Sequence, residues 1–197
     1  MQWIPASALA LLPLAACVVP SLAHARINVG VEEAQQRLFP GQKLSAHPVF
    51  LTEAQRDKMR ELSSVREPFK SERIWRSSDG GWFIIDEVLG KHEMVKYALA
   101  IWPNGSIKGI EIMEYVESYG YEVADAAWRQ QFAGKTSGSP LKLKQDIQNL
   151  SGATLSCKHL TDGVKRLKDL FTIIDNITAS ATTGTFSGKP ESTLVAI

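Results

Sequence analysis

The stretch from Glu72 to Val123 restricts the fold most, because it is rich in β-branched and aromatic residues. Inside it, Asn104-Gly105 separates two apolar runs, and this pair strongly favours a two-residue β-hairpin turn. Side chains alternate over residues 107–115, as is typical of a strand, and Asp79-Gly80-Gly81 separates another pair of strands. The stretch therefore predicts four strands of a twisted antiparallel sheet.

Apolar residues recur at helical spacing on both sides of this stretch. The predicted helices cover residues 30–39, 50–65, 121–134 and about 154–175. Thr52 is expected to cap the second helix, with Gln55 completing a capping box. Residues 141–147 read as a short amphipathic strand. The fold class is therefore α+β, with helices packed on one face of a twisted antiparallel sheet and a strand–turn–helix junction before the last helix.

The N-terminal 25 residues have the features of a secretory signal peptide. They contain no Asp, Glu, Lys or Arg, and they end in Ala23-His24-Ala25, a small-x-small cleavage signal that Arg26 follows. The expected divisions are a signal peptide over 1–25, a folded domain over 26–176, and a low-complexity tail over 177–197. Export to the periplasm is the expected localisation.

Two alternatives for the N-terminus stay open. Met1-Gln2-Trp3 carries no Lys or Arg, which also fits an uncleaved segment that anchors the chain to a membrane. Leu14-Ala15-Ala16-Cys17 resembles a bacterial lipobox, which would leave Cys17 as a lipidated N-terminus. Val18-Val19-Pro20 is apolar where a lipoprotein usually has a polar tether. Either alternative makes the protein membrane-associated.

Composition excludes several classes of function. The net charge of +1 and the lack of a basic run with interleaved aromatics argue against nucleic acid as a partner. Removal of residues 1–25 leaves Cys157 as the one cysteine, which excludes an internal disulfide and indicates a buried thiol. No Cys/His cluster has the spacing of metal ligands, and no Ser/His/Asp order with supporting motifs indicates a hydrolase.

The motif Ser-Gly-Ala-Thr-Leu-Ser, residues 151–156, precedes the last predicted helix. A helix N-terminus offers unpaired backbone N–H groups and the positive end of a dipole, and phosphate is the commonest biological anion that fits it. Ser151, Thr154 and Ser156 add hydroxyl groups. Taken alone, the motif also fits a capped turn with no ligand.

The same motif resembles the attachment site of the FMN-binding domain family, which includes the G subunit of Rnf complexes and the C subunit of sodium-translocating NADH:quinone reductase. The likeness extends over residues 73–172. It includes the strands of 90–123, a Glu-x-x-Gly loop at Glu117, the Trp-Arg-Gln-Gln-Phe-Ala-Gly-Lys run of 128–135, and Thr-Asp-Gly-Val-Lys-Arg-Leu at 161–167.

This resemblance implies FMN as the cofactor, joined through its phosphate to the hydroxyl of Thr154 by a flavin transferase. Further cofactor-binding residues are implied on the motif and on the loop that approaches the flavin. They are Ser151, Gly152, Ala153, Leu155, Ser156, Glu117, Ser118, Tyr119, Gly120 and Tyr121. The implied function is an exported flavoprotein that transfers electrons between a membrane or periplasmic reductase and a cytochrome or another flavin. A carrier is preferred to a substrate-specific enzyme.

One position departs from the family pattern. The family usually carries Asp six residues before the threonine, where this chain has Gln148, and the nearest carboxylate is Asp146. Three readings stay open on this account: covalent FMN, noncovalent FMN, and a cofactor-free exported interaction module on the same fold. A weaker alternative is a flavin-dependent reductase of a small acceptor.

Overall fold

A computed structural model describes the backbone of residues 27–183 and the side chains of residues 27–172. The predicted signal peptide, Cys17, and the tail beyond residue 183 lie outside the described residues. Within residues 27–183, no helix has both the length and the apolar character that a membrane span requires.

The centre of the molecule is a six-stranded antiparallel sheet in the order β1-β6-β5-β4-β3-β2. The strands are β1 (Ile27–Asn28), β2 (Leu44–Ala46), β3 (Ile74–Ser77), β4 (Trp82–Leu89), β5 (Met94–Ile101) and β6 (Ile107–Tyr115). The four predicted strands are confirmed as β3 to β6, and Asn104-Gly105 turns β5 into β6 as expected. The two edge strands were not predicted, because each has only two or three residues.

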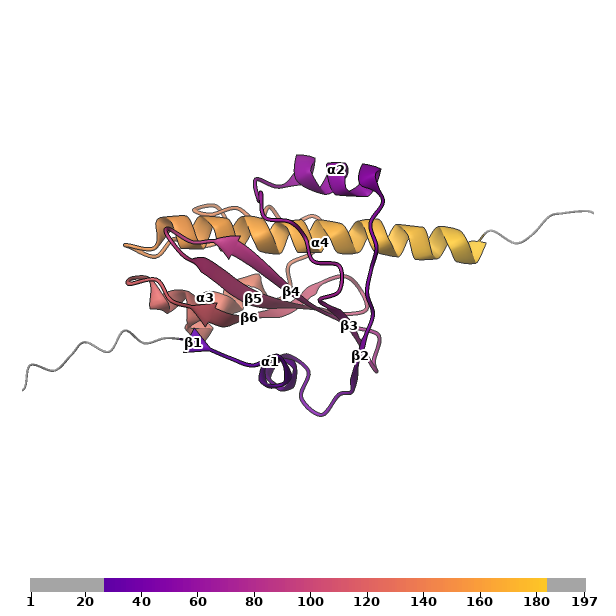
Figure 1. Cartoon of the computed structure of the whole chain (residues 1–197), viewed down its shortest axis with the longest axis horizontal. Coiled ribbons are helices and arrows are strands. Elements are labelled where there is room, and N and C mark those ends of the chain that lie inside the picture. The colour runs from indigo at the N-terminus through magenta and orange to yellow at the C-terminus, as the bar shows by residue number, and fades with distance from the viewer. Residues whose placement is uncertain (1–26, 184–197) are drawn as a thin grey trace, which may run out of the picture.

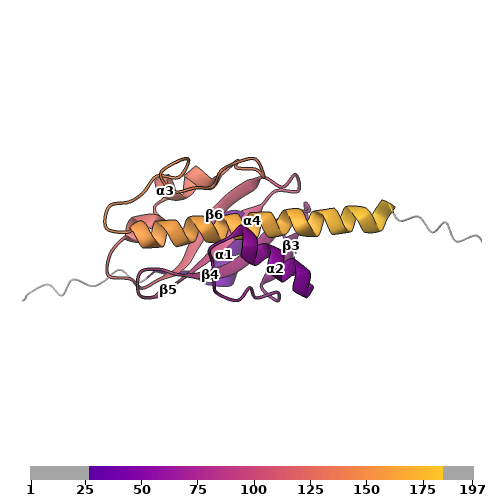
Figure 2. The ribbon, with the colours of Figure 1, turned by 90° about the horizontal axis from the view of Figure 1, so that it is seen from above.

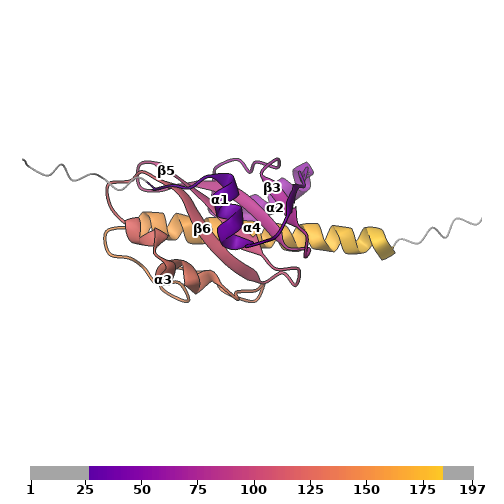
Figure 3. The ribbon, with the colours of Figure 1, turned by 90° about the horizontal axis from the view of Figure 1, so that it is seen from below.

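Helices cover both faces of this sheet, which confirms the α+β class but corrects the expected one-sided packing. Helix α4 (Thr154–Thr183) lies across one face, and α2 (Glu53–Leu62) packs on it. Helix α1 (Val31–Leu38) lies on the other face (Figures 1 to 3). The reason is that β4 is apolar on both sides: Ile84 and Val88 face the α4 core, and Phe83 and Ile85 face the α1 core.

The predicted capping box of α2 is present. Gln55 N–H donates to Thr52 Oγ1 at 3.3 Å, and Thr52 N–H donates to Gln55 Oε1 at 2.8 Å. The predicted helix over 121–134 is instead three short pieces, with η1 at Tyr121–Ala124, α3 at Ala126–Arg129 and η2 at Gln130–Phe132. At the C-terminal end, α4 continues to Thr183 rather than ending near Asp175.

The prediction of a strand over residues 141–147 was wrong. Leu141 and Lys144 have φ angles of 44° and 65°, which are incompatible with a strand, and Leu143 and Ile147 form only an isolated bridge. The Asp146 carboxylate explains this, since it accepts the backbone N–H groups of Leu141 at 3.2 Å and Lys142 at 2.7 Å and so curls the segment. The motif therefore lies at a loop–turn–helix junction.

Candidate functional site

The turn before α4 leaves backbone donors free at the helix start. Gly152 has a φ of 83°, a left-handed conformation that glycine adopts at no steric cost. The first intrahelical hydrogen bond of α4 is the one that Cys157 N–H donates to Ala153 O at 2.9 Å. The N–H groups of Thr154, Leu155 and Ser156 therefore lack intrahelical acceptors. The first turn contains no acidic residue, so the positive end of the helix dipole is not compensated there.

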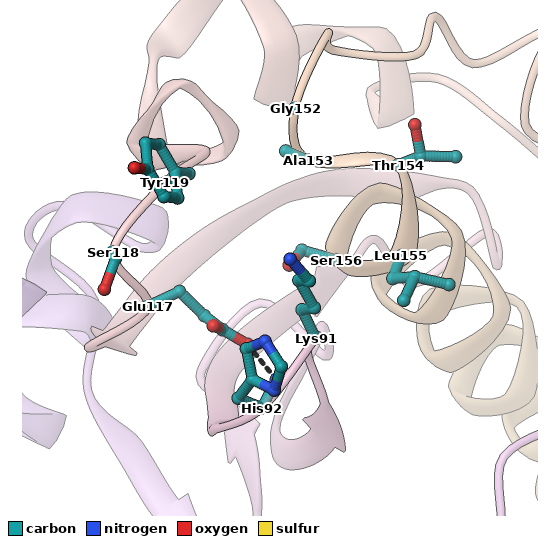
Figure 4. A pocket seen from close by; sticks show the side chains of 10 residues that line it. All are labelled: Lys91, His92, Glu117, Ser118, Tyr119, Gly152, Ala153, Thr154, Leu155 and Ser156. Carbon is teal, nitrogen blue, oxygen red and sulfur yellow. Dashed lines mark hydrogen bonds between the residues drawn. The ribbon is translucent and has the colours of Figure 1, made fainter.

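A cavity of about 330 Å³ lies beside this turn (Figure 4). Three segments that are far apart in the sequence form its walls: the turn between β4 and β5, the loop after β6, and the start of α4. The lining residues are Lys91, His92, Glu117, Ser118, Tyr119, Gly152, Ala153, Thr154, Leu155 and Ser156. A volume of this size is at the lower end of that found for small-molecule sites.

The structure brings together most of the residues expected at the site. Eight of them line the cavity, namely Glu117, Ser118, Tyr119, Gly152, Ala153, Thr154, Leu155 and Ser156. Ser151, Gly120 and Tyr121 do not line it. Tyr119 is 75% exposed at the rim, where its ring is free to cover a ligand. Tyr121 instead packs edge-on against the buried ring of Tyr115, with centroids 5.5 Å apart.

Gly120, on the loop after β6, packs against the turn that contains Ala153 and does not line the cavity. It has a φ of 84°, and a Cβ placed there would lie 2.4 Å from the Ala153 Cβ and 2.8 Å from Tyr115 Oη. Tyr115 Oη donates to Tyr119 O at 2.6 Å, and Ser156 Oγ lies 3.4 Å away. The two walls of the cavity therefore hold each other in place through this contact.

Gly120→Ala is expected to destabilise the protein by about 2–4 kcal/mol, because it combines left-handed strain with overpacking. Gly134→Ala is a matched control: Gly134 has a φ of 77° but nothing within 4 Å of a Cβ, so it should lose only about 1–2 kcal/mol. Urea unfolding of both variants measures the difference. Equal losses in the two variants would contradict the close contact with Ala153.

Glu117 is buried and stabilises the wall of the cavity by accepting hydrogen bonds from backbone N–H groups. Its Oε1 accepts the N–H groups of His92 at 2.6 Å and Glu93 at 3.0 Å. Burial acts to raise the pKa of Glu117, but the backbone donors of His92, Glu93 and Lys91 outweigh it, so that the pKa lies below the ordinary value. The carboxylate is therefore ionised at neutral pH and fixes the turn between β4 and β5.

Three residues at or beside the cavity were not predicted as part of the site, namely Lys91, His92 and Asn149. Lys91 and His92 lie on a turn whose proximity to the motif only the fold reveals. Asn149 Nδ2 donates to Thr154 Oγ1 at 3.1 Å and so orients the hydroxyl group. Asn149 precedes the motif by two residues, and an amide so close to a hydroxyl-bearing turn was a usable local signal.

Gln148, which departs from the family pattern, and the nearby Asp146 both make contacts that hold their own segment in place. Gln148 O accepts from Trp128 Nε1 at 2.9 Å, and Gln148 N–H donates to Gln131 Oε1 at 2.7 Å. The Asp146 carboxylate pairs with Lys135 at 2.8 Å. Asp146 therefore holds its own loop, and the Lys135 ammonium group is already paired.

Several residues within the stretch that resembles the family do not line the cavity. Trp128 and Phe132 pack edge-on in the core with centroids 5.2 Å apart. Lys165 pairs with Asp169 at 2.8 Å. Cys157 is fully buried, and burial raises the pKa of its thiol, in agreement with an unreactive core residue.

These features of the α+β domain suit a phosphate-bearing ligand. Residues 90–169 match the family model of the FMN-binding domain, and every residue that lines the cavity lies within that range. The chain thus carries an FMN-binding domain over this stretch, its cofactor is FMN, and it is a flavoprotein. No curated protein matches the sequence.

The described residues fit this cofactor. An open helix N-terminus, a positive-φ glycine and a lysine meet at one cavity, which suits the phosphate of FMN. The exposed Tyr119 ring and Leu155, which is 45% exposed, supply apolar surface for its ring system.

Proposed function

We propose that this protein is an exported electron carrier whose FMN is esterified through its phosphate to Thr154 Oγ1. One observation carries the proposal: the Thr154 hydroxyl is exposed on the first residue of α4, beside the free N–H groups and on the edge of the cavity. Asn149 donates to the same oxygen and so limits its orientation. A phosphate ester at this atom would keep its charged oxygens at the helix N-terminus.

Bound FMN supplies the redox chemistry. The chain supplies binding and orientation: the motif turn binds the phosphate, Glu117 fixes the wall, and Tyr119 shields one side of the cavity. Since the cavity opens at exposed Tyr119 and Leu155, the cofactor would be accessible to a redox partner, which favours a carrier over a reductase with an enclosed substrate site.

The proposed partners are a flavin transferase for maturation and a membrane or periplasmic reductase or cytochrome for electron exchange. The proposed export rests on the signal-peptide pattern of residues 1–25. The alternative to release from the membrane is attachment to it through Cys17 or an uncleaved N-terminus. A covalent cofactor has a physical use outside the cytoplasm, because a tethered group is not lost by dilution. The family match argues against the cofactor-free module.

Intact mass and an absorbance spectrum test the proposal on protein exported by a host that has the transferase. We expect a mass increase equal to FMN minus one water, together with flavin absorbance that survives denaturation and gel filtration. The mass also identifies the N-terminal residue. An unmodified mass with no flavin absorbance would refute covalent attachment, and steady turnover of a small acceptor without a redox protein would refute the carrier function.

A further inference from the structure

The turn between β4 and β5 places Lys91 at the cavity, and hydrogen bonds fix the backbone of this turn. Gly90 N–H donates to Glu93 O at 2.7 Å and closes the turn. Glu117 Oε1 then binds the backbone of His92 and Glu93. A Cβ on Gly90 would lie 2.6 Å from that oxygen, so the arrangement requires glycine. The backbone of Lys91 is therefore held against the loop that follows β6.

The Lys91 side chain extends from this turn toward the start of α4, and its ammonium group is directed at the turn that contains Ala153 and Ser156 (Figure 4). Lys91 lines the cavity and forms no ion pair with any residue in the described range 27–172. Lys158, by contrast, pairs with Asp162 at 2.6 Å. Glu117, the one carboxylate on the cavity wall, is already occupied by backbone donors.

From this geometry we infer that Lys91 selects a phosphorylated flavin: its ammonium group pairs with the FMN phosphate at the start of α4, so that the site prefers FMN to riboflavin. The inference rests on the proposed position of the phosphate at Thr154. An esterified phosphate keeps one negative charge, and the N–H groups of the helix start are neutral dipoles. Lys91 supplies the full positive charge that the α4 turn lacks, as a point-charge donor to phosphate oxygen.

The preference is measured in the absence of the tether. In Thr154→Ala protein, titrations with FMN and with riboflavin followed by flavin fluorescence give the ratio of the two dissociation constants. We expect Lys91 to contribute about tenfold to this ratio, the effect of one charge-assisted hydrogen bond, in addition to what the helix N-terminus contributes. Adding Lys91→Gln should lower the ratio about tenfold without changing riboflavin binding, and Lys91→Arg should retain most of the preference.

Lys158→Gln in the same background is the matched control. It removes the same charge from the second turn of α4, but Lys158 does not line this cavity. It should leave the FMN preference within about twofold, since the Lys158 ammonium group is exposed and already paired with the Asp162 carboxylate. A preference that Lys91→Gln leaves unchanged, or that Lys158→Gln lowers equally, would overturn the inference.

A second measurement does not depend on free-flavin affinity. Flavin loading should raise the thermal midpoint more in wild-type protein than in Lys91→Gln, because only the wild type pairs an ammonium group with the tethered phosphate. Equal increases in the two proteins would also overturn the role of Lys91. Failure of the proposed function looks different: the wild-type protein would then carry no covalent FMN, whatever residue stands at position 91.

Discussion

Thr154→Ala is expected to abolish covalently held flavin completely. The substitution removes the oxygen to which the phosphate is joined, while the turn and the cavity remain. Thr154 is exposed and is the first residue of α4 rather than its cap, so the variant should lose less than about 1 kcal/mol of stability. The intact mass should therefore be that of unmodified protein, with a far-ultraviolet circular dichroism spectrum like that of the wild type.

Two further variants show whether the loss is specific to this hydroxyl. Thr154→Ser keeps the oxygen and should still carry flavin. Ser151→Ala removes a neighbouring exposed hydroxyl that does not line the cavity, and should be modified as fully as the wild type. Denaturation-resistant flavin in Thr154→Ala would show that the anchor lies elsewhere. Loss of flavin in Ser151→Ala but not in Thr154→Ala would move the anchor to that residue.

The parts of the fold that depend on local chemistry could be predicted from the sequence. The hairpin at Asn104-Gly105, the capping box of Thr52 and the start of α4 at Thr154 follow from turn and cap preferences within a few residues. The site prediction also drew on the resemblance of residues 151–156 to a family motif. The structure adds the cavity that joins this motif to Glu117.

The failures have a common physical cause, which is side-chain contacts that the pattern of residues does not reveal. Residues 141–147 have the alternation of a strand, but the Asp146 carboxylate binds the local backbone and Lys135, which a pattern cannot reveal. Lys91 lies about sixty residues from the motif in the sequence, and only the antiparallel sheet and the Glu117 contacts bring it there. Gly120 was predicted as a cofactor-binding residue, and the structure adds that its absent side chain makes room for Ala153.

Arg166→Met is expected to destabilise the protein by about 3–5 kcal/mol, because it leaves a buried carboxylate without its partner. Arg166 on α4 pairs with Asp86 on β4, and their side chains are 2% and 3% exposed. Tyr97 Oη also donates to Asp86 at 3.1 Å, and Arg166 Nη1 donates to Glu67 O at 2.6 Å. This network holds α4, the helix that carries Thr154, on the sheet. Arg166→Met should therefore reduce flavin loading only by lowering the fraction of folded protein.

The pH dependence of this variant has a definite sign. Burial raises the pKa of Asp86 and Arg166 opposes that increase, so removal of the guanidinium raises the folded-state pKa further above the unfolded value. The folded variant then binds more protons than the unfolded chain between these two pKa values, and its stability falls as the pH rises through that window. Urea unfolding at about pH 5 and about pH 8 should show the larger deficit at the higher pH.

A double variant separates the cost of an unpaired charge from the loss of the pair itself. Asp86→Leu with Arg166→Met removes both charges and keeps similar volume, so it should recover a large part of the stability that Arg166→Met loses. Tyr97 would still lack an acceptor, which costs about 1–3 kcal/mol, and adding Tyr97→Phe should recover that remainder. If the double variant were as unstable as Arg166→Met, the packing of the Arg166 side chain, rather than its charge, would hold α4 on the sheet.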